Sequence, residues 1–410
     1  MSKIPITACV WDTSFFIPLA EYLAQHYEKV LYYCPRESGY MHSNDERIGE
    51  GIEGVEKINS VWDKLDNIDL FVFTDCVFSS EQEYLKSLGK LVWGCGKSEW
   101  LETDRFRTRE WQKSVGLPTQ STEEIIGIDD LKESIKDNQF IKIDKFRADF
   151  ETVKYYDRAR NEQRFDEIKV KLGAHKNHIP FLVENKIDGN ELGYDGWSVD
   201  SKYPLLGMCG VEIKDRAYFC GVIPYSKFPE PVKKVNEKLA EVFKKEKTRC
   251  TFSTEVRIDK KNRGYLIDVA MRNGNPPYQL YMELYSNYAE CIYEGAKGNL
   301  IAPKIKYKYG ALATIKSEFA VHNWLAIRIP KEDRQYVKIM NMTVIDNEVY
   351  HIPLYGLAEV GMVVGCGNTP KEAIDQCKER AGRIKGDSIE IDTDALDDAL
   401  KVLKESGVEI

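Results

Sequence analysis

The stretch Thr251–Pro277, TFSTEVRIDKKNRGYLIDVAMRNGNPP, carries the pattern that decides the fold. Its two halves alternate between polar and apolar residues, as strands do, and the polar run Asp259–Gly264 between them is typical of a turn. A turn centred on the middle of that run places Glu255 on one strand directly opposite Asp268 on the other. We therefore expect a hairpin with two carboxylates facing each other.

Two facing carboxylates repel each other, because the Cβ atoms of such a pair lie about 4.5–5.5 Å apart. Mg²⁺ prefers oxygen ligands and often joins one or two carboxylates to the phosphates of a substrate. The hairpin thus favours a divalent-metal site at Glu255 and Asp268, with an exposed hairpin of scattered charges as the alternative. The loop residues that follow place Arg272 at a strand end, where a cation can meet an anion.

The composition indicates a soluble globular protein with no general affinity for nucleic acid or membranes. The chain has 410 residues, of which 43% are hydrophobic and 30% charged, and its net charge is -8. Nucleic-acid and membrane-surface binders need a basic footprint, and no stretch approaches the roughly 20 apolar residues of a membrane span. The N-terminus shows no signal pattern. Ten cysteines without a CxxC or a Cys/His cluster predict reduced thiols in a cytoplasmic protein.

Residues 1–115 alternate between strand and helix patterns, which predicts a parallel sheet covered on both faces. The strands are expected at 6–10, 29–33, 69–74 and 90–93, and the helices at 15–26 and 81–88. The turn after the first strand is Trp-Asp-Thr-Ser, without the GxGxxG fingerprint, which disfavours a dehydrogenase-like Rossmann protein. Asp12 and Asp75 follow strand ends, where such sheets bind ligands, although helix capping is an alternative for each.

The remainder of the chain continues as mixed α/β structure. A helix expected over 99–115 carries Arg105, Arg107 and Arg109. Arginine side chains on a helix are usually solvated, so on this ground alone the three are expected to face solvent. Further helices are expected at 229–244, 279–293, 370–383 and 394–406. Strands are expected at 139–144, 153–156, 180–184, 310–315, 324–329, 336–344, 348–353 and 361–365.

The linker Glu184–Glu191, ENKIDGNE, follows a buried strand and has a carboxylate at each end. The backbone of such a linker can hydrogen-bond the flat edge of a base. Glu191 can accept hydrogen bonds from ribose hydroxyls.

Lys142, this linker and the acidic pair, in that order, resemble the ATP-grasp superfamily, and within it phosphoribosylamine–glycine ligase. The resemblance runs over nearly the whole chain. Its more specific parts are the hinge Glu-x-x-Leu-x-Gly-x-Glu, similar to Glu184–Glu191, and the signature Glu-x-Asn-x-Arg-x-Gly-x-Pro, similar to Asp268–Pro276. Weaker similarities lie at Leu101–Arg105, Ile141–Lys142, Gly361–Gly365 and Thr369–Ile374.

The resemblance implies an α/β protein with the ATP-grasp fold. It implies an N-terminal Rossmann-like parallel-sheet domain over 1–115 and a small lid subdomain over 116–190. The catalytic subdomain with the metal site would cover 191–305, and a C-terminal α+β subdomain 306–410.

Carried over position by position, the resemblance also implies roles for site residues. Arg105 and Lys142 would neutralise phosphates of ATP. The hinge after Glu184 would bind adenine through the main chain of Asn185, Lys186 and Ile187, and Glu191 would bind the ribose. Glu255 and Asp268 would hold Mg²⁺ or Mn²⁺. Arg272 would meet the substrate carboxylate or the transferred phosphate, and Lys214 would reach the γ-phosphate.

Three departures separate this chain from the family pattern. The loop that covers the phosphates is glycine-rich in the family, because backbone amides approach phosphates closely. Here the stretch 146–152 has no glycine, and Arg147 would supply charge instead. Ala270 stands where the signature has Asn, so water or Asn273 would complete the metal site. The N-terminal glycine-rich loop is also absent, which argues against the purine-pathway substrate.

These observations predict an ATP-dependent carboxylate–amine ligase that forms an amide through an acylphosphate and releases ADP and phosphate. The alternative is a non-catalytic or regulatory ATP-binding protein on the same fold. The expected partners are a small carboxylate and a small amine, with neither nucleic acid nor membrane, and the expected assembly is a monomer or homodimer. The sequence identifies neither the acid nor the amine.

Overall fold

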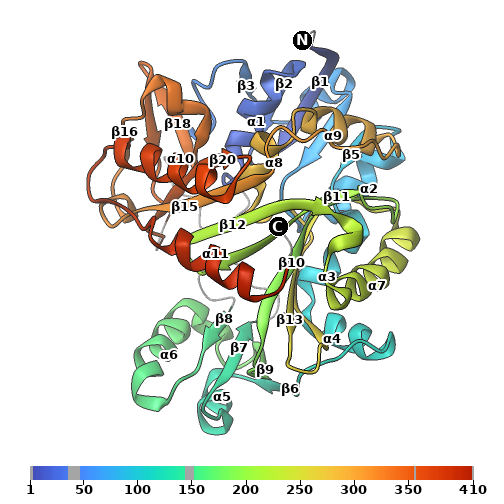
Figure 1. The fold of residues 1–410 in the computed structure, drawn as a ribbon, viewed down its shortest axis with the longest axis vertical. Coiled ribbons are helices and arrows are strands. Elements are labelled where there is room, and N and C mark those ends of the chain that lie inside the picture. The colour runs from blue at the N-terminus through green and yellow to red at the C-terminus, as the bar shows by residue number, and fades with distance from the viewer. Residues whose placement is uncertain (1–2, 36–46, 144–151, 355–356, 409–410) are drawn as a thin grey trace.

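A computed structural model describes residues 3–35, 47–143, 152–354 and 357–408. Its main body contains a parallel sheet near the N-terminus and a large antiparallel sheet, and a smaller lobe lies below them in Figure 1.

The N-terminal sheet has five parallel strands in the order β3-β2-β1-β4-β5. The predicted strand–helix alternation and parallel sheet are confirmed. The strands are β1 Ile4–Trp11, β2 Tyr27–Tyr33, β3 Val55–Lys57, β4 Leu70–Phe73 and β5 Leu91–Trp93, and the helices α1 Ile17–Ala24 and α2 Ser79–Ser87 pack among them. Strands β1 and β4 pair in parallel up to their ends, and just beyond them the Thr13 hydroxyl donates a 2.8 Å hydrogen bond to Asp75.

The second sheet has nine antiparallel strands in the order β14-β13-β10-β11-β12-β15-β20-β17, with β21 also paired to β15. It runs across the predicted boundary between residues 305 and 306, since β12 pairs directly with β15. The strands are β10 Asn190–Val199, β11 Leu206–Ile213, β12 Ala217–Pro224, β13 Arg249–Ile258, β14 Gly264–Ala270, β15 Tyr309–Ser317, β17 Val337–Ile339, β20 Glu359–Gly367 and β21 Ile389–Ile391.

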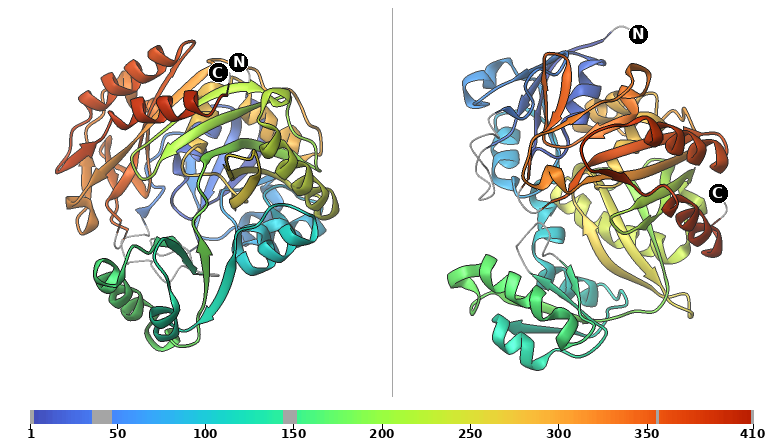
Figure 2. Two further views of the ribbon diagram at one scale, coloured as in Figure 1. Left: turned by 60° about the horizontal axis from the view of Figure 1, so that its bottom comes forward. Right: turned by 90° about the vertical axis from the view of Figure 1, so that its left-hand side faces the viewer.

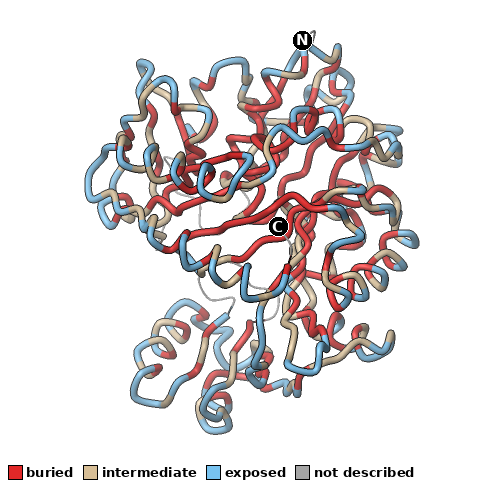
Figure 3. Tube along the Cα trace, in the orientation of Figure 1, coloured by how far each residue is buried: buried red, intermediate tan, exposed pale blue. Residues whose placement is uncertain are grey.

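Helices cover both faces of this sheet, and the largest continuous core lies between them (Figure 3). The amphipathic helix α7 packs on β10, β13 and β14, whereas the C-terminal helix α11 packs on β11 and β12. The helices are α7 Glu230–Glu246, α8 Tyr278–Leu284, α9 Tyr288–Ala296, α10 Pro370–Arg383 and α11 Ala395–Glu405. Helix α10 begins with a full capping box, in which the side chains of Thr369 and Glu372 bond each other's backbone N–H groups.

The smaller lobe lies to one side of the main body (Figure 2) and has a hydrophobic core of its own. Its four strands run in the order β6-β9-β7-β8, and two helices cover them. The elements are β6 Thr122–Ile126, α5 Ile128–Ser134, β7 Gln139–Ile143, β8 Thr152–Lys154, α6 Arg158–Leu172 and β9 Pro180–Asn185. We call this lobe, residues 122–185, the lid. A last, three-stranded sheet contains β16 Leu325–Ile327, β18 Met342–Ile345 and β19 Glu348–His351.

Three elements expected to be continuous are interrupted. The helix expected over 99–115 is two helices, α3 Trp100–Thr103 and α4 Arg105–Ser114, because Asp104 leaves the helical conformation and its side chain caps α4 by accepting the Arg107 N–H at 3.0 Å. The helix expected over 279–293 divides into α8 and α9, and the strand expected over 336–344 divides into β17 and β18.

The hairpin of β13 and β14 confirms the pairing of Glu255 with Asp268. The strict alternation expected along the second strand is wrong, however, because a β-bulge at Ile267 shifts the register between Glu255 and Val256. Leu266 consequently pairs with Val256 and is fully buried, although the alternation placed it beside Asp268. The bulge leaves Glu255 opposite Asp268 as expected. The residues next to the turn, however, pair one position away from the expected register.

Candidate active site

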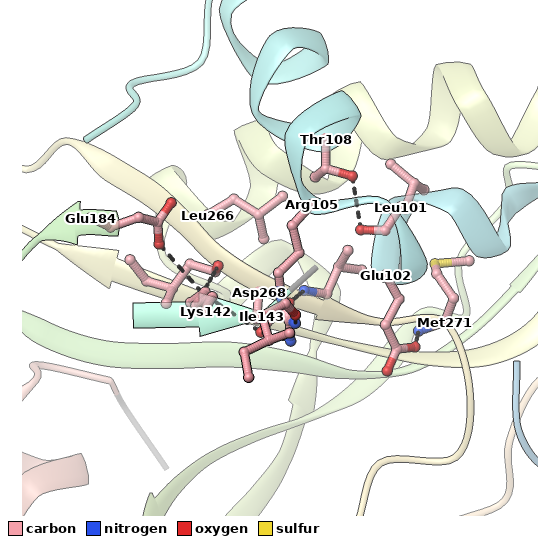
Figure 4. A network of polar contacts seen from close by, with 12 residues as sticks. Leu101, Glu102, Arg105, Thr108, Lys142, Ile143, Glu184, Leu266, Asp268 and Met271 are labelled. Atoms are coloured by element: carbon pink, nitrogen blue, oxygen red, sulfur yellow. Dashed lines mark hydrogen bonds and ion pairs between the residues drawn. The ribbon is translucent and has the colours of Figure 1, made fainter. Parts of the chain in front are cut away.

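Asp268 lies beside two cationic side chains that come from different elements (Figure 4). Its Oδ2 atom is 3.5 Å from Nη2 of Arg105 at the start of α4, and 3.7 Å from Nζ of Lys142 on lid strand β7. Burial alone would raise the pKa of Asp268, but Lys142 and Arg105 outweigh it and hold that pKa below its ordinary value. Asp268 is therefore a stable carboxylate at neutral pH.

Glu255 has the opposite electrostatic setting. Burial and repulsion by Glu191 and Asp268 would both raise the pKa of Glu255 above its ordinary value. Because residue 255 is exposed to solvent, we attribute the rise mainly to the repulsion, which acts without burial. The acidic pair thus has one member held beside two protein cations and one whose repulsion by other carboxylates is only partly offset, by Lys214.

A buried network lies next to this pair and joins the lid to the main body. Glu184, only 3% exposed on β9, accepts hydrogen bonds from Nε and Nη2 of Arg109, the second at 3.2 Å, and lies 3.5 Å from Nζ of Lys142. Burial opposes ionisation of Glu184, but the two cations prevail and lower its pKa to about 2. Glu184, which the resemblance assigned to the hinge, is therefore a buried partner of these cations.

The bulge supplies a further anchor for the same cations. The Ile267 carbonyl accepts hydrogen bonds from Nζ of Lys142 at 2.9 Å and from Nη2 of Arg109 at 2.6 Å. Arg105 bonds the Ile143 carbonyl of the lid at 2.8 Å. Lys142 and Arg105 are thus fixed at the junction between lid, α4 and hairpin.

Arg109 is a site-lining residue that the sequence reasoning left in solvent. Arg105 and Arg109 are 7% and 3% exposed, whereas Arg107 is exposed as expected. A spacing of four places the first two on one helical face, and this spacing was the available signal. The two arginines face the hairpin because that face of α4 packs against it.

Arg272 lies where the end of β14 meets the N-terminal sheet. Its Nε donates a 3.0 Å hydrogen bond to Glu102 on α3 and lies 3.6 Å from Asp75. Glu102 also accepts the Met271 N–H at 2.6 Å. Glu102, which the sequence analysis did not single out, therefore orients Arg272. This geometry brings the predicted substrate arginine to the strand end that carries Asp75.

The hinge residues are partly engaged within the protein. The Asn185 N–H donates to the Ser121 carbonyl at 3.2 Å, and Nζ of Lys186 lies 3.0 Å from Asp188. The Ile187 carbonyl accepts a 3.4 Å bond from Arg257, which also pairs with Glu191. Glu191 therefore lies on the same sheet face as Glu255, held by an arginine of the neighbouring strand.

Lys214 follows strand β11 and is exposed to solvent. Its side chain is 80% exposed and its Nζ lies 3.8 Å from Glu212. Attraction to Glu212 raises its pKa above the ordinary value. Asn273, proposed as a substitute ligand for Ala270, is buried, and its N–H bonds the Thr74 carbonyl at 3.1 Å. Arg147 and the loop 146–151 lie outside the described residues.

The donor set around the hairpin suits a hard divalent cation held by few protein ligands. Within the described part of the chain, no group of three His, Cys, Asp or Glu side chains is placed to hold a metal ion. Glu255 and Asp268 therefore offer two carboxylates, and the remaining ligands of an octahedral ion would be water or phosphate oxygens, as Mg²⁺ commonly accepts.

None of the helices among the described residues is long and apolar enough to cross a membrane.

Comparison with known proteins finds this architecture in solved structures but no similar sequence. No protein-family model matches the chain, and no significant match is found among curated proteins. Phosphoribosylamine–glycine ligase from Thermotoga maritima is similar with a TM-score of 0.71 and 14% identity, over 94% of this chain and 98% of that one. The biotin carboxylase domain of 2-oxoglutarate carboxylase from Hydrogenobacter thermophilus, a complex with MgADP and bicarbonate, gives 0.67 and 12%, over 98% of each chain.

L-amino acid ligase from Bacillus licheniformis is a third similar structure, with a TM-score of 0.62 and 13% identity, over 94% of this chain and 99% of that one. These structures share the ATP-grasp fold. The chain described here has that fold over nearly its full length, at a sequence identity low enough to make it a divergent example.

Proposed function

We propose that this protein is an ATP-dependent carboxylate–amine ligase. The observation that carries the proposal is the position of Asp268, which faces Glu255 across the hairpin and is approached by Lys142 from the lid and Arg105 from α4. Acidic oxygens for a metal and fixed cations for phosphates are thus adjacent, as phosphoryl transfer requires. The similar ligase structures support the same class of reaction.

In this proposal the cations that now pair with Asp268 serve the phosphates of ATP. Lys142 and Arg105 are oriented by carbonyl groups of Ile267 and Ile143, so little reorganisation is needed when an anionic phosphate approaches. The hinge at 185–187 binds adenine and Glu191 binds the ribose, while Arg147 acts on the phosphates from the lid loop.

Mg²⁺, or Mn²⁺, would be held by Glu255 and Asp268 and would supply charge neutralisation for the phosphoryl group. A similar structure is a complex with MgADP, which supports this choice of ion and nucleotide. Within the chain itself, Glu102 holds Arg272 in place to meet the substrate carboxylate, and Lys214 extends toward the γ-phosphate.

The reaction we propose has two steps. The substrate carboxylate oxygen attacks the γ-phosphorus, and the bond from this phosphorus to the β-phosphate oxygen breaks. ADP departs, and an acylphosphate is formed. An amine nitrogen then attacks the acyl carbon, the carbon–oxygen bond to phosphate breaks, and an amide and phosphate form. The protein positions and neutralises, because phosphoryl transfer needs little covalent participation from side chains.

The test is ADP release from Mg²⁺-ATP in the presence of pooled amino acids and small amines, with product masses monitored for amide formation. We expect ADP formation that depends on both a carboxylate and an amine. Tight ATP binding without ADP formation in any pool would reject the ligase proposal.

A second candidate is an ATP-binding protein without turnover. It is favoured by Ala270 in place of the expected amide ligand and by the two-carboxylate donor set among the described residues. Mg²⁺-dependent ATP binding with a silent enzyme assay would support it.

We further propose that the protein acts in the cytoplasm as a monomer or homodimer, with domains over 1–115, 116–190, 191–305 and 306–410. The cytoplasmic location is supported by the ten cysteines, all among the described residues and none in a disulfide, nine of them buried.

A further inference from the structure

Glu359, at the first position of β20, is a carboxylate that has no role in the phosphoryl transfer proposed above. Its Oε1 accepts a 3.1 Å hydrogen bond from the Asn275 amide, and Asn275 in turn accepts a 2.6 Å bond from Nε2 of the buried Gln279. Asn275 lies three residues after Arg272, in the loop that follows β14. Glu359 is thus held at the edge of the proposed substrate region by a defined chain of side-chain amides.

The register of the large sheet turns Glu359 toward the acidic pair. An irregularity between Ile315 and Lys316 places Glu359 opposite Lys316. Following the pairs from strand to strand, Glu359, Glu212 and Glu255 lie on one face of the sheet. Glu212 is close enough to act electrostatically on both of the other two carboxylates.

We propose that Glu359 accepts a proton from a positively charged amine, which is the second substrate of the ligase. This inference rests on the proposed function and assigns the chemical class of the amine. An alkylammonium ion cannot attack an acylphosphate until it loses a proton, and the acidic sheet face would attract the cation. One proton of the ammonium passes to Glu359 and a second leaves with the phosphate, so that acylphosphate and ammonium give amide, hydrogen phosphate and one released proton.

The ionisation of Glu359 suits this role. Burial raises its pKa to about 7, and Asp215 and Glu212 add to the shift, whereas Asn275 and Lys316 oppose it. Tyr278 on α8 is also within electrostatic reach. A carboxyl group whose pKa lies near neutrality exchanges protons with an amine more readily than an ordinary, strongly acidic one.

Hydroxylamine provides the decisive test, since it is largely neutral at pH 7 and traps acylphosphates without prior loss of a proton. Wild type and Glu359→Gln are compared with the amino-acid pool as carboxylates. The nucleophile is either hydroxylamine or a set of glycine, ethanolamine and putrescine. We expect Glu359→Gln to lose about 100-fold in amide formation while hydroxamate formation stays within about twofold. Glu390→Gln is the matched control, because Glu390 also lies opposite Lys316 but is exposed.

Several outcomes would overturn the inference. It is overturned if Glu359→Gln leaves both products unchanged or reduces both equally, and also if the wild type forms hydroxamate but no amide from any of the three amines. Absence of hydroxamate in the wild type would instead remove the proposed function on which the inference rests.

A second variant keeps the inference testable if Glu359→Gln fails to fold. Asn275→Ala leaves the carboxylate but removes the hydrogen bond that lowers its pKa. Amide formation requires ionised Glu359 and so rises with pH through its pKa; in Asn275→Ala this rise should move to higher pH. An unmoved pH profile would contradict the assignment.

Discussion

The two ends of the acidic pair lie in regions of opposite electrostatic character. On the Asp268 side, Lys142, Arg105 and Arg109 converge from the lid and from α4, and each is bound by a carboxylate or a carbonyl. On the Glu255 side the neighbours are Glu191 and Glu212, with the exposed Lys214 nearby.

This difference separates a preformed anchor from a site that needs an external cation. The cationic side is satisfied within the protein, so its geometry is set before any substrate binds. The acidic side holds like charges in proximity, which costs free energy until a positive group reaches it. A metal ion and a cationic amine are the two proposed ways of relieving that repulsion.

The largest effect should come from breaking the contact between the two sides at Asp268. Asp268→Asn leaves one carboxylate for the proposed metal ion and removes the charge that Lys142 and Arg105 face. We expect kcat for ADP formation to fall about 100- to 1,000-fold while the ATP dissociation constant changes much less. Steady-state kinetics and equilibrium ATP binding measure the two quantities. The exposed Asp66→Asn serves as control, and wild-type turnover in Asp268→Asn would show that Asp268 is not a ligand.

The cationic side alone is tested through stability. Glu184→Gln leaves Arg109 and Lys142 without their buried carboxylate and should lower the free energy of unfolding by about 3 kcal/mol. Chemical denaturation measures the loss, with the exposed Glu123→Gln of the adjacent strand β6 as control. A stability equal to that of the control would mean that this network does not tie the lid to the body.

The same network predicts a pH dependence with a definite sign. The pKa of Glu184 is about 2 in the folded chain, whereas an unfolded Glu has a pKa of about 4.3. A lowered folded-state pKa gives stability that is fully present above pH ~4.3 and is lost as the pH falls toward ~2. The stability difference between wild type and Glu184→Gln should therefore shrink across that interval, and a constant difference would contradict the ion pairing.

On the acidic side, Glu191→Ala should act mainly on nucleotide affinity. Removing the proposed ribose acceptor, which is also a partner of Arg257, should weaken ATP binding about tenfold, the worth of one hydrogen bond to a charged group. Isothermal titration with ATP gives the dissociation constant directly. An unaltered constant would remove Glu191 from the ribose site and leave it as a structural partner of Arg257.

The smallest effect is expected at Lys214. Its side chain is exposed, so its attraction to phosphate competes with water and salt. Lys214→Met should raise KM for ATP about threefold at low ionic strength, with the difference fading as salt is added. A salt-independent loss of kcat would place Lys214 at the transferred phosphate instead.

Much of this arrangement could be predicted from the sequence because it depends on local patterns. The position of the turn between β13 and β14 predicted the facing pair, and the strand–helix alternation predicted the parallel N-terminal sheet. The bulge at Ile267 could not be predicted, since one extra residue in a strand leaves no compositional mark. Hairpin length alone nevertheless led to the correct partner for Glu255, because the shift at the bulge offset the difference at the turn.

Long-range partners were harder to predict for a different reason. Arg109 and Glu102 acquire their roles from Glu184 and Arg272, residues far from them in the chain. Helix spacing indicated which arginines share a face but not what that face contacts. The contribution of Glu359 depends on a sheet irregularity and on a side-chain amide from another segment, neither of which a strand pattern encodes.

The bulge at Ile267 also determines what a one-residue shortening of β14 would change. Without this residue the ladder would run in one uninterrupted register, with Leu266 still beside Val256 and Asp268 still beside Glu255. What would vanish is the peptide oxygen that Lys142 and Arg109 share. A one-residue deletion here would keep the two carboxylates paired but weaken the attachment of the lid. The length of β14 would therefore predict lid mobility better than the identity of the two acidic residues.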